Sequence, residues 1–291
     1  MTFIRSALPL LLCCCSWGCI RTGAENLGTK RSAAVDLNKL SSPASLLAAL
    51  GRQGPAIDPL LGAHAFAIHS TVQVSTKGLP VETLEENVRM DCDGKGNFHL
   101  LRNNSHSQGM EAIGAANLLY VRSRFAPFTT RRAEADDAVR LRALGEGQAK
   151  GTLTIFADWL SIKENANSMR DGHKIRHFAL SALASPRRPA NRPAAERWRA
   201  TMQVTSLAGD LAIDATTGAA LEMTLHAEYT FVRESSSGPI AVKVEFEQRS
   251  AAPDPIVVPS DALASPRRPR PLLDRQTLLE GLNESTRARP N

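Results

Sequence analysis

The stretch GDLAIDATTGAALEMTLHAEYTFV at residues 209–232 decides the fold, because its apolar and polar side chains alternate. One face takes Leu221, Met223, Leu225, Ala227, Tyr229 and Phe231, and the opposite face takes Glu222, Thr224, His226, Glu228 and Thr230. Alternation with a period of two is typical of a half-buried β-strand. The residues DATTG at 214–218 predict a turn that joins this long strand to the one before it.

The same alternation recurs along the chain. Further strands are predicted at 65–75 (Phe66, Ile68, Val72 and Val74 inward), 83–92 (Leu84, Val88, Met90 and Cys92 inward), 98–102, 118–124, 174–183 and 240–248 (Ile240, Val242, Val244 and Phe246 inward). A sheet with one polar face and one apolar face is usually antiparallel, and its apolar face needs a cover.

The period changes between Glu134 and Asn165. Leu153, Phe156, Ala157 and Leu160 recur at helical spacing, and Ile155, Trp159 and Ile162 form a second apolar stripe. A helix with two apolar stripes is expected to be buried on more than one side. The sequence therefore predicts an α+β fold, in which helices cover the apolar face of a mostly antiparallel sheet.

The amino terminus indicates export. Arg5 precedes an apolar run from Ala7 to Cys15, whose length suits a signal peptide and is too short for a membrane-spanning helix. Gly18 and Cys19 then resemble the lipobox of bacterial lipoproteins, in which the cysteine is acylated after cleavage. We expect residues 1–18 to be a signal peptide and Cys19 to be the site of lipid attachment.

Alternatives to this interpretation stay open. Ser16 and Trp17 depart from the usual lipobox residues, and Cys15 is a weaker candidate because Cys14 stands before it. Ordinary secretion and a cytoplasmic chain with a chance apolar start are the other two interpretations. Four of the five cysteines lie in this region, which leaves Cys92 without a partner for an internal disulfide.

Composition argues against nucleic-acid binding. The formal charge is +6, but five arginines and one glutamate concentrate positive charge at 181–200, whereas three basic and seven acidic residues occupy 201–250. Aromatic residues make up 5% of the chain and do not alternate with the arginines as a base-stacking surface requires.

The chain divides into four parts. After the signal peptide, 19–59 forms a lipidated tether with one short helix, capped by Ser42, opened by Pro43 and ended at Gly51. The sheet domain spans 60–250 with a central helical insertion, and 251–291 is a flexible tail rich in Pro and Arg, with a short helix at 274–282. The octapeptide ALASPRRP occurs at 182–189 and at 262–269, either as an extended spacer or as a docking or headgroup-binding motif.

No catalytic or cofactor motif is present in the sequence, so we expect no enzyme activity, no cofactor and no metal. His173 and His177 are four apart, but on a strand that spacing separates them by about 13 Å. His69 and His226 are expected on the polar face as solvated histidines, with a titratable base as the alternative. Cys92 is expected to be a small core residue rather than a nucleophile.

The strand, D-x-x-TG turn and strand at 209–223 resemble the hairpin of LolA-like periplasmic lipoprotein carriers, and the order of elements resembles bacterial lipoproteins of this length. The resemblance implies an incomplete, curved barrel that holds acyl chains against helices. Carried onto this chain, it implies an apolar ligand lining of Phe66, Ile68, Phe156, Trp159, Leu160, Leu225, Tyr229, Phe231, Val244 and Phe246. Residues 185–200 and the basic tail depart from that family.

Two functions follow. The first is a membrane-tethered envelope lipoprotein, on the periplasmic side of the outer membrane, that binds lipid, an acylated ligand or a lipoprotein cargo in the concave sheet. The second is a non-enzymatic structural or interaction lipoprotein with a solid core, whose protein partner the sequence does not identify.

Overall fold

The computed structural model describes residues 36–37, 39–51, 54, 57–134, 136–187, 194–233 and 238–265. The chain divides into two units after Asp36, and all the described helices and strands belong to the unit that begins at Leu37. The predicted signal peptide, Cys19 and the helix at 274–282 lie outside the described residues.

The elements follow one another in a single series. They are α3 (Pro43–Ala49), α4 (Asp58–Leu61), β1 (His64–Thr76), β2 (Glu82–Cys92), β3 (Phe98–Asn104), β4 (Gly109–Ala115), β5 (Leu118–Ser123), β6 (Thr129–Arg132), α5 (Asp137–Ala143), α6 (Gln148–Ile155), β7 (Leu160–Glu164), β8 (Ser168–Arg170), β9 (His173–Ala182), the 3₁₀-helix η1 (Ala194–Thr201), β10 (Gln203–Asp214), β11 (Ala220–Phe231), β12 (Ile240–Ala251) and β13 (Leu263–Ala264).

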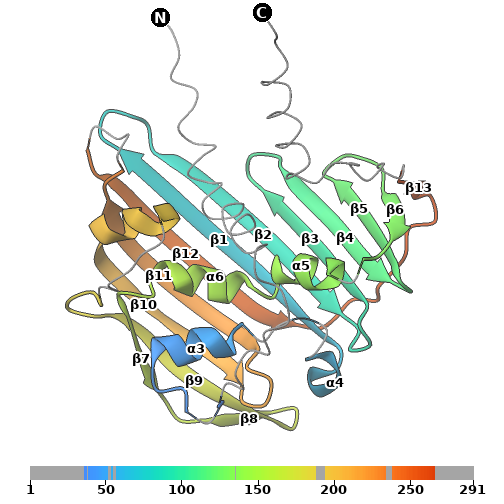
Figure 1. Ribbon diagram of the computed structural model, residues 1–291, viewed down its shortest axis with the longest axis horizontal. Helices are drawn as coiled ribbons and strands as arrows, with labels where there is room; N and C mark the ends of the chain where they lie inside the picture. Colours follow the sequence, from blue (N-terminus) through green and yellow to red (C-terminus); the bar gives the residue numbers. More distant parts are fainter. Residues whose placement is uncertain are drawn as a thin grey trace, which may run out of the picture. The chain divides into compact units, whose positions relative to one another are not determined.

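The strands form one curved sheet that does not close (Figure 1). Among the described residues its order is β13-β6-β5-β4-β3-β2-β1-β12-β11-β10-β9-β7, with β8 paired to β9. All pairs are antiparallel except the short parallel pair of β13 and β6. The first long strand, β1, therefore lies beside the last long strand, β12, in the middle of the sheet.

The predicted alternation is confirmed on the central strands. In β11 every second residue from Leu221 to Phe231 is buried, and in β12 the same holds from Ile240 to Gln248. β1 and β2 follow the pattern with Phe66, Ile68, Val88 and Met90 buried. The apolar sides of these strands face one way, so the core lies on one face of the sheet.

The β10–β11 turn forms because Asp214 caps it. The Asp214 carboxylate accepts hydrogen bonds from the Thr216 and Thr217 amides at 3.0 and 2.6 Å and from the Thr217 hydroxyl at 2.8 Å. Gly218 follows with φ of +77°, a conformation that favours glycine. The D-x-x-TG pattern thus predicted the hairpin correctly.

Helix α3 forms where the sequence predicts it. Ser42 is its N-cap and makes a capping box with Ser45, and Pro43 occupies the first turn. Leu46, Ala49 and Leu50 are buried, so this helix packs into the unit rather than interrupting a free tether. In Figure 1, α3, α5 and α6 lie on the same side of the sheet.

The long helix predicted around Leu153–Ile162 is wrong in its second half. α6 ends at Ile155, and Leu160 and Ile162 lie on β7, opposite Ala182 and Leu180 of β9. A short apolar run satisfies both the helical and the strand period, and here the unpaired edge of β9 decides for a strand.

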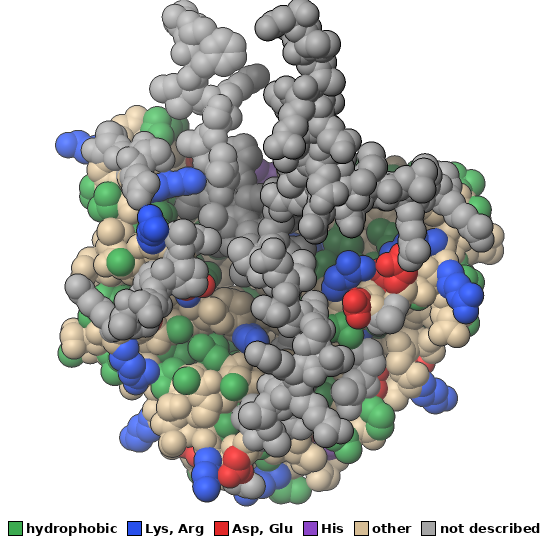
Figure 2. All heavy atoms as spheres, in the orientation of Figure 1, with side chains coloured by type: hydrophobic (Ala, Val, Ile, Leu, Met, Phe, Trp, Pro, Cys, Tyr) green, Lys and Arg blue, Asp and Glu red, His purple; other side chains and the backbone are tan. Residues whose placement is uncertain are grey.

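The sheet also contains strands that the sequence did not predict. β4 is rich in glycine and alanine, β6 and β8 are short and polar, and β13 lies inside the predicted flexible tail. Figure 2 shows Lys and Arg side chains scattered over the visible described part of one face, with hydrophobic side chains between them.

Candidate functional site

The predicted apolar lining is buried on one face of the sheet. Each of its ten residues is at most 6% exposed. Leu225 of β11 is the register partner of Phe246 of β12, and Val244 of β12 is the partner of Val72 of β1, so strand pairing holds these side chains in one layer.

Aromatic contacts join part of this layer to the segment after α6. The Phe156 and Tyr229 rings meet edge to face, with centroids 5.5 Å apart and planes at 85°. Phe231 lies 6.2 Å from Tyr229 and 5.2 Å from Trp198 of η1, centroid to centroid. Trp159 follows α6 in a turn, and Leu160 belongs to the sheet itself, so neither lies on the helix that the sequence predicted.

The side chain of Gln248 brings a polar group into the apolar layer. Gln248 of β12 is 1% exposed, and its Nε2 donates to the Ala220 carbonyl at 2.6 Å. Its Oε1 is buried and has no hydrogen-bond partner among the described residues. Such an oxygen can accept a hydrogen bond from a ligand that enters the layer.

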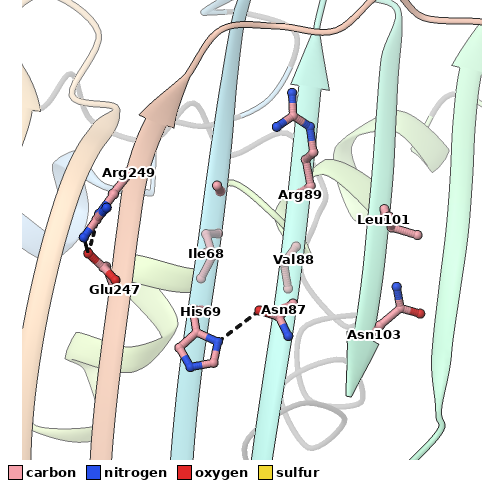
Figure 3. A pocket seen from close by; sticks show the side chains of 10 residues that line it. Ile68, His69, Asn87, Val88, Arg89, Leu101, Asn103, Glu247 and Arg249 are labelled. Carbon is pink, nitrogen blue, oxygen red and sulfur yellow. Dashed lines mark hydrogen bonds and ion pairs between the residues drawn. The ribbon is translucent and has the colours of Figure 1, made fainter. Parts of the chain in front are cut away.

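The polar face carries a separate shallow depression of about 360 Å³ (Figure 3). His69 and Asn87 lie in it and share a hydrogen bond of 3.0 Å between Nδ1 and Oδ1. Glu247 and Arg249 form an ion pair at its rim. His69 and His226 are both exposed, as predicted for the polar face.

His173 and His177 have different partners, as expected for two histidines along a strand. The Nδ1 of His173 lies 3.0 Å from Asp214, and the Nε2 of His177 lies 2.8 Å from the Ser168 hydroxyl. These contacts do not bring the two rings into one site.

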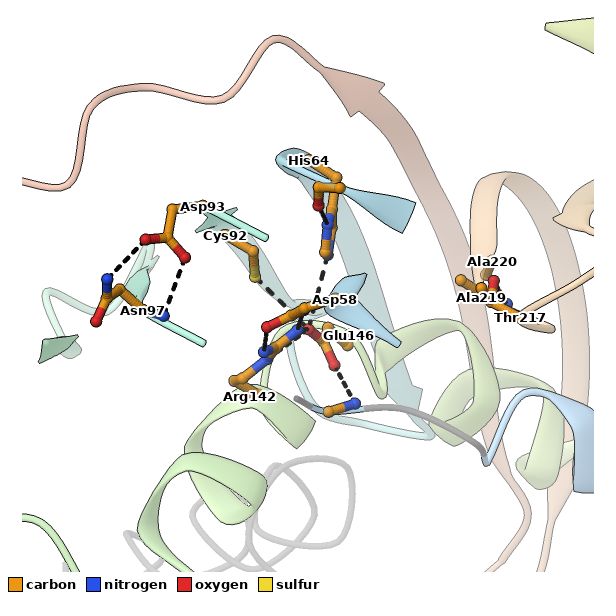
Figure 4. Close-up of polar contacts among 12 residues, drawn as sticks. Asp58, His64, Cys92, Asp93, Asn97, Arg142, Glu146, Thr217, Ala219 and Ala220 are labelled. Atoms are coloured by element: carbon orange, nitrogen blue, oxygen red, sulfur yellow. Dashed lines mark hydrogen bonds and ion pairs between the residues drawn. The ribbon is translucent and has the colours of Figure 1, made fainter. Parts of the chain in front are cut away.

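A buried polar cluster lies where β1 begins and β2 ends (Figure 4). It consists of Asp58 of α4, His64 of β1, Cys92 of β2, Arg142 of α5 and Glu146 of the α5–α6 turn, which we call the buried polar cluster. His64 and Cys92 are direct register partners, so their side chains share the inward face. Gly145 packs on Met90, where an added Cβ would lie 3.0 Å from the Met90 Cβ, and this close approach places Glu146 beside Cys92.

Arg142 is the centre of this cluster and is completely buried. Its guanidinium donates to both oxygens of Asp58 at 2.6 Å and, through Nε, to Glu146 Oε1 at 2.7 Å. Burial opposes its charge, but the bonds to Asp58 and the charge of Glu146 outweigh burial and raise the pKa of Arg142. Removing one partner of such a network would leave a buried charge uncompensated.

Cys92 and Glu146 complete the contacts. The Cys92 Sγ lies 3.7 Å from Glu146 Oε1, and Glu146 Oε2 accepts from the Gly54 amide at 2.7 Å. Burial raises the pKa of the Cys92 thiol. Burial also opposes ionisation of Glu146, but the charge and hydrogen bonds of Arg142, together with the bond from the Gly54 amide, lower its pKa below the ordinary value.

The prediction that Cys92 is a small buried residue is confirmed, but its surroundings are polar. The sequence analysis missed the cluster. Extending the alternation of Phe66 and Ile68 by one step would have placed His64 inward, and Arg142 and Glu146 stand four residues apart. The register that joins His64 to Cys92 has no comparable signal in the sequence.

Within the described residues, no helix has the length and apolar character that a bilayer crossing requires.

No protein-family model and no curated protein matches this chain. Among solved structures, lipoprotein LppX of Mycobacterium tuberculosis matches at 10% identity with a TM-score of 0.26, over 74% of this chain and 100% of that one. LprF of Mycobacterium bovis matches at 15% identity and 0.27, over 75% and 99%. A LolA-superfamily protein of Nitrosomonas europaea matches at 7% identity and 0.24, over 74% and 94%. Lipoproteins and a LolA-superfamily protein, the kinds of protein that the sequence resembles, are thus among the solved structures that match.

Proposed function

We propose that this chain is a non-enzymatic, lipid-anchored envelope protein that holds an acyl-bearing lipid against the apolar face of its sheet. The observation that carries the proposal is the continuity of that face. Strands β11 and β12 present every second side chain inward, from Leu221 to Phe231 and from Ile240 to Gln248. The adjacent strand β1 adds Phe66, Ile68 and Val74, with Ser70 and Val72 half-buried between them. A row of this length can contact an extended acyl chain along its whole length. Each methylene of the chain that is buried there contributes about 0.8 kcal/mol to the free energy of binding.

The helical segments are the proposed cover of the acyl chain. α3, α5 and α6 have only seven, seven and eight residues, and the turn between α5 and α6 contains Gly145 and Gly147. A short helix can separate from a sheet at lower cost than a long one, and α6 is the helix that adjoins the lining, through Phe156 at its end. The lining is that predicted from the sequence, and the carboxamide oxygen of Gln248 would accept a hydrogen bond from a hydroxyl or amide of the ligand.

The proposed anchor is Cys19, acylated after removal of residues 1–18. Two or more acyl chains on one cysteine hold a protein stably on a bilayer. The proposed location is the bacterial envelope, on the periplasmic side of the outer membrane.

Organic extraction followed by mass spectrometry tests the binding function. The Cys19→Ser variant is purified without detergent, so that no acyl chain of the anchor contributes to the signal. We expect about one equivalent of non-covalent acyl lipid per chain. Lipid no more abundant than in a similarly purified unrelated protein would rule the proposal out.

A solid-core interaction lipoprotein is the second candidate. The low exposure of all ten lining residues supports it, because close packing of the protein's own side chains is enough to bury them. Its test is deletion of residues 266–291. This second function predicts that the truncated chain stays folded but loses protein partners that the full chain retains in pull-downs from envelope extracts.

A further inference from the structure

The buried polar cluster contains two features that its ion pairs leave unexplained. The first is the Nε2 of His64, which is buried and has no hydrogen-bond partner among the described residues. The second is its charge, because the one guanidinium of Arg142 faces the two carboxylates of Asp58 and Glu146. Uncompensated charge in a buried site is costly, so both features call for a further positive group.

The orientation of His64 is that of a metal ligand. Its Nδ1 lies 2.8 Å from the Gly62 carbonyl oxygen, which can only accept, so Nδ1 carries the proton and donates it. The lone pair of Nε2 then points toward Glu146 Oε1, 4.0 Å away. Histidines that bind metals commonly donate their second ring nitrogen to a carbonyl or carboxylate in this way.

We propose that His64 Nε2, Cys92 Sγ and Glu146 Oε1 bind a zinc ion at the junction of β1, β2 and the α5–α6 turn. This site does not depend on the proposed lipid-binding function.

The ligand atoms are close to the required spacing. One ligand atom from each of Asp58, His64, Cys92 and Glu146 can be chosen so that all four lie within 4.8 Å of one another. Zinc bonds of about 2.0 to 2.3 Å place tetrahedral ligands about 3.3 to 3.7 Å apart, so shifts of about 1 Å or less complete the site. Glu146 Oε1 turns from Arg142 to the ion, and Oε2 keeps its bond from the Gly54 amide.

Charge and proton balance also fit zinc. Binding deprotonates Cys92 and releases that proton to solvent. The doubly charged ion and Arg142 together then balance the Cys92 thiolate, Glu146 and Asp58, with Asp58 still held by Arg142 through two hydrogen bonds. A thiolate and an imidazole favour zinc over magnesium or calcium, which prefer oxygen ligands.

Metal titration of the full chain tests the site after EDTA treatment. We expect one equivalent of Zn²⁺ to bind in competition with a chromophoric chelator. We also expect Co²⁺ to give a thiolate-to-cobalt charge-transfer band. Cys92→Ser and His64→Gln should each lower Zn²⁺ affinity by about a hundredfold and Cys92→Ser should abolish the band, because each removes a direct ligand.

Two controls separate this site from the four amino-terminal cysteines and from misfolding. A chain with Ser at positions 13, 14, 15 and 19 should keep both the stoichiometry and the band, as should His69→Gln, which alters an exposed histidine. Added Zn²⁺ should raise the Tm of the wild-type chain and not that of folded Cys92→Ser. Binding well below one equivalent, or a cobalt band that survives Cys92→Ser, would overturn the proposal and leave an ion-pair network that acts only in stability.

Discussion

At the residue scale, Asp137 makes stability depend on pH. Its buried carboxylate accepts hydrogen bonds from Arg131 at 2.6 and 2.8 Å, from Arg140 at 2.9 Å and from the Glu134 amide at 2.7 Å. The bonds from Arg131, followed by those from Glu134 and Arg140, outweigh burial and lower the pKa of Asp137 from 3.8 to about 2. A group with a lowered pKa in the folded chain stabilises the fold above its unfolded pKa.

The Asp137→Asn variant tests this effect. The full shift corresponds to about 2 kcal/mol, and solvent screening of the partly exposed arginines reduces the expected loss at pH 7 to about 1 to 2 kcal/mol. The difference between wild type and variant should shrink as the pH falls from about 4 toward 2, because Asp137 then becomes protonated in both states. Urea unfolding at several pH values measures it.

Asp136→Asn is the matched control, since Asp136 is exposed and makes no side-chain capping bond. It should change the free energy of unfolding by less than about 0.5 kcal/mol. A difference for Asp137→Asn that stays constant from pH 7 to pH 2.5 would contradict the assignment.

Individual buried apolar residues were predictable from the sequence, whereas buried polar partners were not. The alternation placed Phe66, Leu225 and Phe246 inward because each stands in a strand with a clear period of two. His64 meets Cys92 through strand register, and both approach Glu146 through tertiary packing, which local periodicity does not encode.

At the scale of elements, the β10–β11 turn is also a packing point for α3. A Cβ added at Gly218 would lie 3.0 Å from the Ala49 carbonyl oxygen, and the residue has φ of +77°. Gly218→Ala should therefore lower the free energy of unfolding by about 1 to 2 kcal/mol, through backbone strain and displacement of α3. Chemical denaturation measures the change.

Gly151→Ala provides a control of opposite sign. Gly151 lies inside α6, and a Cβ added there meets no atom within 4 Å. Alanine is the better helix former, so this variant should gain up to about 1 kcal/mol. If Gly218→Ala and Gly151→Ala changed the free energy of unfolding equally, the β10–β11 turn would have no specific role in packing α3.

Helices and strands with a clear sequence pattern were predicted from the sequence. Strands that form because a neighbouring strand offers hydrogen-bonding partners were not. Ser42 and Pro43 marked α3, and strict alternation marked β11 and β12. β7 forms because the edge of β9 is available for pairing. The side chains of β4 differ too little in polarity for a period of two to be recognised in the sequence. The pairing of β1 with β12 likewise depends on the whole sheet.

At the scale of the whole molecule, anchoring should depend on one cysteine. Cys19→Ser should move the protein from the membrane fraction to the soluble fraction and remove the acyl mass from the intact chain. Cys15→Ser is the control and should leave both unchanged. Release by Cys15→Ser and not by Cys19→Ser would move the attachment site to the weaker candidate.

Ala227→Leu distinguishes a ligand-holding face from a solid core. Ala227 lies between Leu225 and Tyr229 on the apolar side of β11 and is 1% exposed. If an acyl chain occupies this layer, the added methyl groups should lower bound lipid by about tenfold, with stability changed by less than about 1 kcal/mol. A solid core would instead lose about 1 to 3 kcal/mol from overpacking.

His226→Leu changes the adjacent residue on the polar face and should leave bound lipid at the wild-type level. Reduced stability of Ala227→Leu with unchanged bound lipid would favour the solid core.

Mapping the cross-links of a photoreactive fatty acid tests the central claim most directly. The acyl chain is proposed to lie against β11 and β12, so irradiation followed by peptide mass spectrometry should place cross-links on inward residues such as Leu225, Tyr229 and Phe246, and on Phe156. Cross-links confined to the polar-face depression around His69 and Asn87, or none above an irradiated blank, would contradict it.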